Sequence, residues 1–340
     1  MIAGYVLEVA CASLVNRTIG TAECFFWEVN IKDRMTGVLA GMAAGDALGA
    51  GYEFGPALPD DEAVAMRGGG VFNWAPGEWT DDTSMAVPIG RALARGDDLA
   101  APATLGLIVD EWAVWAQTAP DVGNQTRAVL GMLATQGSSE DDARRAAEAV
   151  HRSQGQSAGN GSLMRTAPVA LGYLDDPAGL ASVARRVSDL THFDPEAGDA
   201  CVLWCLAIRR AVVDGEHSLR DGLSALPAAR QSLWASRIDV AEASQPRDFE
   251  HNGWVVEALQ GAWSAITHGS SLVDVLSRAV RGGNDTDTVA AIAGGLAGAY
   301  YGVGGVPSAW REVLHGWPGL DFGGLVELAG AAALGGAPRR

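Results

Sequence analysis

The sequence has 340 residues, and its 41 acidic residues outnumber its 24 Lys and Arg residues, which gives a net charge of −17. A field of this sign repels phosphate backbones and anionic lipid surfaces, so we expect neither nucleic acid nor a membrane as a partner. No apolar run in the sequence is long enough to span a bilayer, and we expect a soluble, cytoplasmic protein.

The beginning of the chain differs in character from the rest. Residues 1–34 are predicted to be an N-terminal extension of uncertain order. Asp33 has the side chain of an N-cap for a helix that starts near Met35. We therefore expect a single domain over residues 35–340, because no low-complexity linker or internal repeat divides this range.

Helical periodicity dominates from Met35 onward. Residues 138–152 open with serine and acidic residues and then repeat alanine and valine at helical spacing. Residues 251–269 place Trp254 and three alanines on one stripe, and Gly269 is a suitable stop. Because no strand series is visible and Ala and Gly allow close helix contacts, the pattern predicts an all-α fold, a compact orthogonal multi-helix bundle.

Two cysteines lie in one of these predicted helices. Cys201 and Cys205 are four residues apart among apolar neighbours, so they share one helix face. This placement is typical of buried thiols rather than of a metal or redox site.

Two acidic clusters directly precede predicted helices and share one composition, two carboxylates with two threonines. They are Thr80, Asp81, Asp82 and Thr83, and Asp285, Thr286, Asp287 and Thr288. Helix capping explains either cluster alone. The two together offer the all-oxygen ligand set that Mg²⁺, Mn²⁺ or Ca²⁺ requires, and a two-metal site follows if the fold brings them together.

Two glycine-containing turns also precede predicted helices. Residues 159–162 form a Gly-Asn-Gly-Ser turn, whose backbone N–H groups are suited to binding phosphate at a helix start. Gly123 repeats this arrangement at the start of another helix. His192 lies in a loop ahead of a further helix, and nothing beside it in the sequence assigns its role.

The motifs occur in an order that resembles the ADP-ribosylglycohydrolase family. The resemblance covers about residues 35–305 and rests on "GVLAGMAAGDALGAGYEFGP", "GEWTDDTSM", "DVGNQTRAV", "GNGSLMRTAPVAL", "THFDPEAGDA" and "GGNDTDTVAAIAGGLAGAYYG". It implies an all-α hydrolase with two divalent cations, Mg²⁺ or Mn²⁺. Such an enzyme cleaves the glycosidic bond between ADP-ribose and an acceptor, which is a protein side chain or a small conjugate.

The resemblance also implies roles for individual residues. The implied metal ligands are Thr80, Asp81, Asp82, Asp285, Asp287 and Thr288. The implied substrate-binding residues are Glu53, Asp121, Gly123, Asn160, Gly161, Ser162, Met164 and His192. The candidate catalytic carboxylates are Glu53, Asp82 and Asp121, and which of them transfers the proton stays open. Asp46 is interpreted as a structural residue that ties a helix to a loop.

Other functions remain alternatives at this stage. One is a non-catalytic, ADP-ribose-binding or crystallin-like structural member of the same fold, which predicts eroded metal ligands, whereas both acidic clusters are intact here. Another is a phosphohydrolase or a nucleoside hydrolase that uses the same metals. The sequence does not distinguish arginine, serine or other acceptors, and we expect a monomer.

Overall fold

The computed structural model describes residues 21–335. The α-helices are α2 (Thr21–Gly49), α3 (Asp81–Ala94), α4 (Pro102–Trp115), α5 (Asn124–Gln136), α6 (Glu140–Gln154), α7 (Pro177–Asp189), α8 (Pro195–Asp214), α9 (Ala228–Ala243), α10 (Val255–His268), α11 (Leu272–Arg281), α12 (Thr286–Tyr301), α13 (Ser308–Arg311) and α14 (Phe322–Gly335). Short 3₁₀ helices cover Asn160–Ser162, Ala167–Tyr173, Arg220–Ala225, Pro246–Asp248 and Val303–Gly305. Within the described range, the named strands are the two-residue pair β1 (His315–Gly316) and β2 (Leu320–Asp321), so the predicted all-α class is confirmed.

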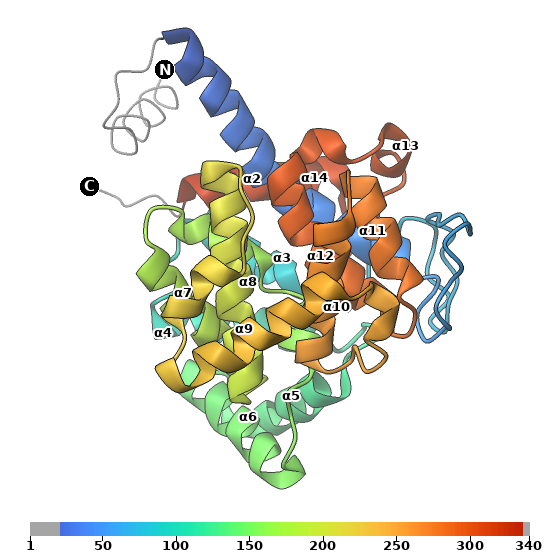
Figure 1. Cartoon of the computed structure of the whole chain (residues 1–340). Helices are drawn as coiled ribbons and strands as arrows, with labels where there is room; N and C mark the ends of the chain where they lie inside the picture. The colour runs from blue at the N-terminus through green and yellow to red at the C-terminus, as the bar shows by residue number, and fades with distance from the viewer. Residues whose placement is uncertain (1–20, 336–340) are drawn as a thin grey trace.

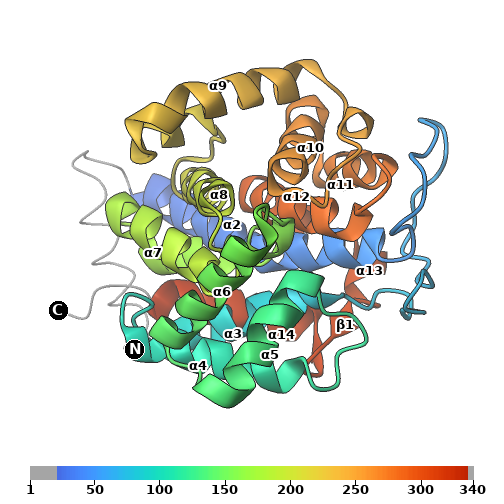
Figure 2. The same ribbon diagram turned by 90° about the horizontal axis from the view of Figure 1, so that it is seen from below.

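The helix pair α2 and α12 forms the centre of the molecule, and the two helices lie side by side in both ribbon views (Figure 1, Figure 2). Glycines make this close approach possible. A Cβ at Gly298 would lie 2.0 Å from the carbonyl oxygen of Gly37, and one at Gly294 would lie 2.1 Å from that of Gly41. The backbones therefore touch directly, as the Ala and Gly content predicts.

The remaining helices surround this pair. Helices α8, α10 and α11 pack on α12, and α14 and α3 pack on α2. Buried tryptophans join the layers, because Trp204 Nε1 donates to the carbonyl of Ile292 at 3.1 Å and Trp112 Nε1 donates to that of Met85 at 2.8 Å. Cys201 and Cys205 are both free and fully buried in this core, which confirms the interpretation as buried thiols.

Two local predictions are wrong. Helix α2 begins at Thr21, so Asp33 lies inside the helix and is not its N-cap. Its carboxylate instead accepts from the N–H of Gly304 at 3.3 Å. Trp254 stands before the first residue of α10 and is 38% exposed, because the chain turns there instead of continuing the buried stripe. The predicted extension over residues 1–34 lies mostly outside the described residues.

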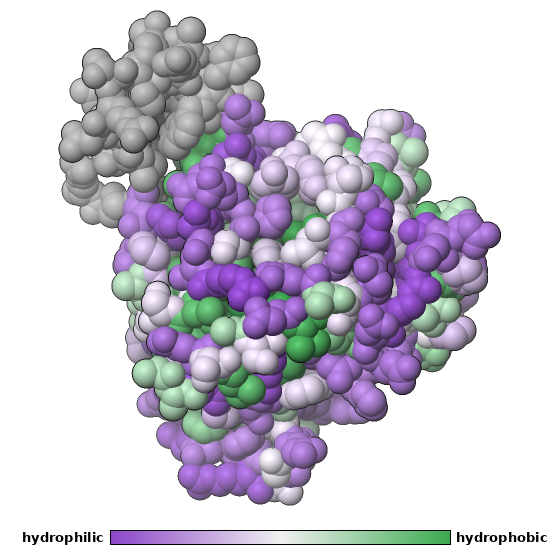
Figure 3. Space-filling model, viewed as in Figure 1, coloured by the Kyte–Doolittle hydropathy of each residue, from purple (hydrophilic) through white to green (hydrophobic). Residues whose placement is uncertain are grey.

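The surface is mixed in character. On the face shown in Figure 3, hydrophobic residues form small patches between hydrophilic ones. Leu233 and Val240 are exposed large hydrophobic residues of α9. None of the helices described is both long and apolar enough to cross a membrane.

Candidate active site

The first acidic cluster is held in place by Asp46, which lies near the end of α2. Asp46 Oδ1 accepts from the backbone N–H and the hydroxyl of Thr80, both at 2.8 Å, and Oδ2 accepts from the N–H of Thr83 at 2.9 Å. The side chain of Thr80 makes no capping hydrogen bond to α3. Asp46 therefore caps α3 from a neighbouring helix, and helix capping does not explain Asp81 and Asp82.

The second cluster is fixed by two asparagines from other segments. Asn160 Nδ2 donates to Asp285 Oδ2 at 2.7 Å, and the N–H of Asp285 donates to Asn252 Oδ1 at 3.0 Å. The carbonyl of Asn252 accepts the second N–H of the Asn160 amide at 2.8 Å. The hydroxyl of Thr286 donates to the carbonyl of Gly49, the last residue of α2, at 2.9 Å. The start of α12 is thus attached both to α2 and to the Gly-Asn-Gly-Ser turn.

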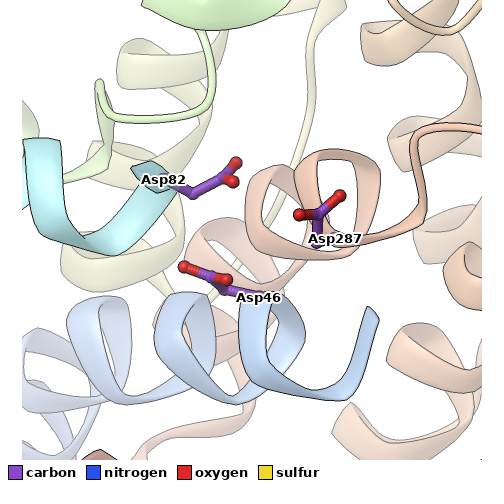
Figure 4. A group of neighbouring side chains, drawn as sticks. All are labelled: Asp46, Asp82 and Asp287. Atoms are coloured by element: carbon purple, nitrogen blue, oxygen red, sulfur yellow. The ribbon is translucent and has the colours of Figure 1, made fainter. Parts of the chain in front are cut away.

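The close contact between α2 and α12 brings the two acidic clusters together. Carboxylate oxygens of Asp46, Asp82 and Asp287 lie within 4.8 Å of one another, and Figure 4 shows the three neighbouring side chains on α2, α3 and α12. Oxygens of Glu53, Asp285 and Asp287 form a second group within the same limit. Because Asp287 belongs to both groups, the two are adjacent.

The electrostatics of these groups favour a bound cation. Burial raises the pKa of Asp287, and the nearby charges of Glu53, Asp82 and Asp285 raise it further. Burial, with Asp285 and other carboxylates, raises the pKa of Glu53 to about 9. Glu53 Oε2, Asp82 Oδ1 and Asp287 Oδ1 are buried oxygens without a hydrogen-bond partner among the described residues. Buried acceptors of this kind are costly unless a proton or a cation satisfies them.

A cavity of about 1030 Å³ opens above the acidic groups. Among its described lining residues none is Lys or Arg, so the lining offers the carboxylates no permanently charged cation. The Gly-Asn-Gly-Ser turn and His192 form part of its wall, and Phe54 and Trp254 line it with side chains that are 64% and 38% exposed. The volume is sufficient for a ligand of dinucleotide size.

Most of the residues that the sequence singles out face this cavity. Its lining includes Glu53, Asp81, Asp121, Gly123, Asn160, Gly161, Met164, His192, Asp285, Asp287 and Thr288. Three others lie behind it. Thr80 and Asp82 are buried beside Asp46, and Ser162 is buried with its hydroxyl accepting from that of Ser188 at 2.9 Å. The roles of all these residues stay predictions.

Two residues of the site were not among the expected ligands. Asp46 is the one charged residue in the apolar run "GMAAGDALG", and this isolation in a buried helix is a signal that could have identified it. Asn252 carries no such signal, because it is 33 residues from Asp285 in sequence and meets it only through the fold.

Comparisons with known proteins agree with this geometry. Residues 28–338 match the protein family described as ADP-ribosylglycohydrolase. The ADP-ribosyl-[dinitrogen reductase] glycohydrolase of Rhodospirillum rubrum is 33% identical over 300 residues, covering 84% of this chain and 91% of that protein. The ADP-ribosylarginine hydrolase Tri1 of Pseudomonas putida is 31% identical over an alignment that covers 87% of this chain and 78% of the Tri1 protein.

One more distant relative and a solved structure extend the comparison. The human ADP-ribosylhydrolase ARH3 is 25% identical, covering 85% of this chain and 91% of that protein. A solved structure described as an ADP-ribosylglycohydrolase-related protein complex superposes with a TM-score of 0.73 at 33% identity, covering 90% of this chain and 98% of the other. By sequence and by fold, the chain belongs to the ADP-ribosylglycohydrolase family.

Proposed function

We propose that this protein uses two divalent cations, Mg²⁺ or Mn²⁺, to hydrolyse the glycosidic bond between ADP-ribose and an arginine side chain, and so reverses ADP-ribosylation. The observation that carries the proposal is the pair of carboxylate groups that share Asp287 beside a cavity of about 1030 Å³. The family membership and the named relatives support the same reaction.

The residues present fit the cations. The groups consist of oxygen donors alone, which Mg²⁺ and Mn²⁺ prefer, and three buried oxygens lack a partner among the described residues. The proposed ligands are Thr80, Asp81, Asp82, Asp285, Asp287 and Thr288, with Asp46 in the same group as Asp82 and Asp287. When bound, the cations lower the pKa of a water molecule and orient ribose hydroxyls.

Glu53 and Asp121 are the better candidates for proton transfer. Both line the cavity, whereas Asp82 is fully buried behind it and is better suited to holding a cation. Burial and neighbouring carboxylates raise the pKa of Glu53 to about 9, a direction that suits a carboxyl group acting as a general acid. The transition state is oxocarbenium-like, and the carboxylates around it stabilise its developing positive charge.

Recognition of ADP-ribose is assigned to the turn beside the second carboxylate group, where Asn160 Nδ2 donates to Asp285 Oδ2 at 2.7 Å. The N–H of Asn160 is donated to the carbonyl of Gly253 at 3.1 Å, so the backbone donor of the turn is assigned to Gly161, which lies next to His192. Gly123 and Met164 also line the cavity. Ser162 is assigned a backbone contribution, because its side chain is buried behind the lining of the cavity. Backbone donors are suited to the diphosphate because they carry no side-chain charge that would pair with the nearby carboxylates.

Charge favours arginine as the acceptor. Two divalent cations supply four positive charges, and the carboxylates around them outnumber these: Asp46, Glu53, Asp81, Asp82, Asp121, Asp285 and Asp287. The remaining negative charge attracts a guanidinium and gives a neutral serine linkage no such advantage. The relatives that share 33% and 31% identity carry names that refer to dinitrogen reductase and to ADP-ribosylarginine.

The alternatives are less well supported. A non-catalytic binding or crystallin-like protein does not require buried carboxylates with unpartnered oxygens, which cost stability. The net charge of −17 disfavours nucleic acid as a partner. We further propose that the protein acts as a cytoplasmic monomer and that residues 35–340 form its single domain.

The test is release of ADP-ribose from arginine- and serine-linked substrates, each measured with Mg²⁺, with Mn²⁺ and with EDTA. We expect cation-dependent release from the arginine linkage and much slower release from the serine linkage. The variant Asp285→Asn should lose this activity, whereas Asp176→Asn, which changes an exposed helix-capping carboxylate, should retain it. Faster release from the serine linkage would contradict the assigned acceptor, and undiminished release in EDTA would contradict the metal mechanism.

A further inference from the structure

A buried arginine lies directly behind the Gly-Asn-Gly-Ser turn. The side chain of Arg165 is fully buried, its guanidinium lies 4.1 Å from the centre of the Trp112 ring, and no described carboxylate forms a salt bridge with it. Its Nη1 donates to the carbonyl of Gly161 at 3.2 Å, and its Nη2 donates to the hydroxyl of Thr191 at 2.6 Å. Burying a charge without an opposite charge is costly, so a role in the site would explain why it is kept there.

The contact with Thr191 has a fixed direction. A guanidinium only donates hydrogen bonds, so the hydroxyl oxygen of Thr191 must accept the one from Arg165. The hydroxyl proton is then free to be donated, and Nδ1 of His192 lies 2.8 Å away. Among the described residues this nitrogen is the one acceptor in contact with the hydroxyl. Thr191 therefore donates to His192 Nδ1.

This direction determines where His192 carries its proton. An Nδ1 that accepts a hydrogen bond has no proton, so the neutral ring must carry its proton on Nε2. Burial and then the charge of Arg165 lower the pKa of His192 to about 3, which keeps the ring neutral. The Nε2 atom has no hydrogen-bond partner among the described residues, and His192 lines the cavity.

Glycines give this nitrogen access to the cavity. A Cβ at Gly161 would lie 3.1 Å from His192 Nε2, and one at Gly159 would lie 3.3 Å from it. Both distances are shorter than an ordinary carbon–nitrogen contact, so larger residues would press on the ring. The N–H of His192 thus lies beside the turn to which phosphate binding is assigned.

We propose that Arg165 and Thr191 are positioning residues that hold neutral His192 in the Nε2–H tautomer, so that this N–H donates a hydrogen bond to a phosphate oxygen of ADP-ribose. The inference rests on the proposed function for the identity of the ligand. It explains how a cavity whose described lining contains no Lys or Arg recognises a diphosphate: a neutral donor serves there, and the positive charge stays behind the turn.

The tautomer is measured first, by ¹⁵N NMR of the full-length protein without substrate or metal, with the His192→Gln spectrum identifying the signals. We expect a proton on Nε2 and none on Nδ1. Thr191→Val removes the hydroxyl and should move part or all of the proton to Nδ1, whereas Thr191→Ser should preserve the wild-type tautomer. A wild-type proton on Nδ1, or an unchanged tautomer in Thr191→Val, would overturn the proposal.

Binding of ADP-ribose in the presence of Mg²⁺ is measured next by calorimetry. Thr191→Val and His192→Leu should each raise the Kd about tenfold or more, because one hydrogen bond to a charged oxygen is lost. His192→Gln keeps an N–H at a similar reach and should bind within a few-fold of wild type, as should Thr191→Ser. Equal affinities for His192→Leu and His192→Gln would refute the donor role. Because the tautomer is observed without substrate, its result does not depend on whether hydrolysis is found.

Discussion

The contact between α2 and α12 predicts that Gly298→Ala severely destabilises the protein. The new Cβ would lie 2.0 Å from the carbonyl oxygen of Gly37 and 2.8 Å from its carbonyl carbon. Both atoms are backbone, so no side chain can rotate away, and the helices must separate by about 1 Å or more to reach van der Waals contact. Overpacking of this kind costs about 3 kcal/mol of unfolding free energy, and it outweighs the gain of about 1 kcal/mol that alanine brings to an unobstructed helix.

Urea unfolding followed by circular dichroism measures this cost. The matched control is Gly131→Ala in α5, where a Cβ would meet no atom within 4 Å. We expect the control to gain about 0.5–1 kcal/mol while Gly298→Ala loses about 3 kcal/mol. Because the same separation moves Asp287 away from Asp46, Gly298→Ala should also weaken Mn²⁺ binding. A stability within about 0.5 kcal/mol of wild type would refute the argument that these backbones are in direct contact.

Three further substitutions test other parts of the structure. The pKa of His192 is lowered to about 3 in the folded protein. Below pH 6.5 the histidine therefore binds a proton in the unfolded chain but not in the folded protein, and the free energy of unfolding falls as the pH falls. His192→Gln should avoid about 2.3 kcal/mol of this loss between pH 6.5 and 4.5 in urea unfolding, and equal losses would contradict the buried neutral ring. Asp199→Ala leaves Arg185 and Arg230 without their fully buried carboxylate and should cost about 3 kcal/mol of unfolding free energy, whereas a change under about 1 kcal/mol would argue against the ion pairs. In Asp46→Asn the side-chain amide has one oxygen and cannot accept from the N–H groups of both Thr80 and Thr83. This variant should weaken Mn²⁺ binding about 10–100-fold in calorimetry, and an unchanged affinity would be the contrary result.

Local patterns predict the helices and the two acidic helix starts, because these depend on residues close in sequence. Residues 138–152 illustrate this, since Ser139 caps α6 as its sequence indicates, with its hydroxyl accepting from the N–H of Asp142 at 3.2 Å. The start of α2 was predicted too late, because a polar residue such as Asp33 can lie inside a helix when a distant loop satisfies it.

Asp46 was expected to tie a helix to a loop, and its hydrogen bonds to Thr80 and Thr83 confirm this, but the particular long-range partners that hold the site were not predictable from the residues alone. Asp46 caps α3 across 34 residues, and Asn252 joins the turn at Asn160 to the start of α12. The direction of the hydrogen bonds from Arg165 through Thr191 to His192 likewise depends on which atoms the fold brings within reach. The order of the motifs along the chain identifies many of the residues that line the cavity, but it does not show which hydrogen bonds position them.

Release of ADP-ribose from ADP-ribosylarginine, measured as a function of Mn²⁺ bound per chain, tests most directly whether the two carboxylate groups form the active metal centre. We expect activity to rise as the two groups fill and to be abolished by EDTA. We also expect Asp287→Asn, which alters the residue common to both groups, to lower both cation binding and release. Full activity in the cation-free protein, or wild-type activity in Asp287→Asn, would contradict a metal-dependent reaction at this site.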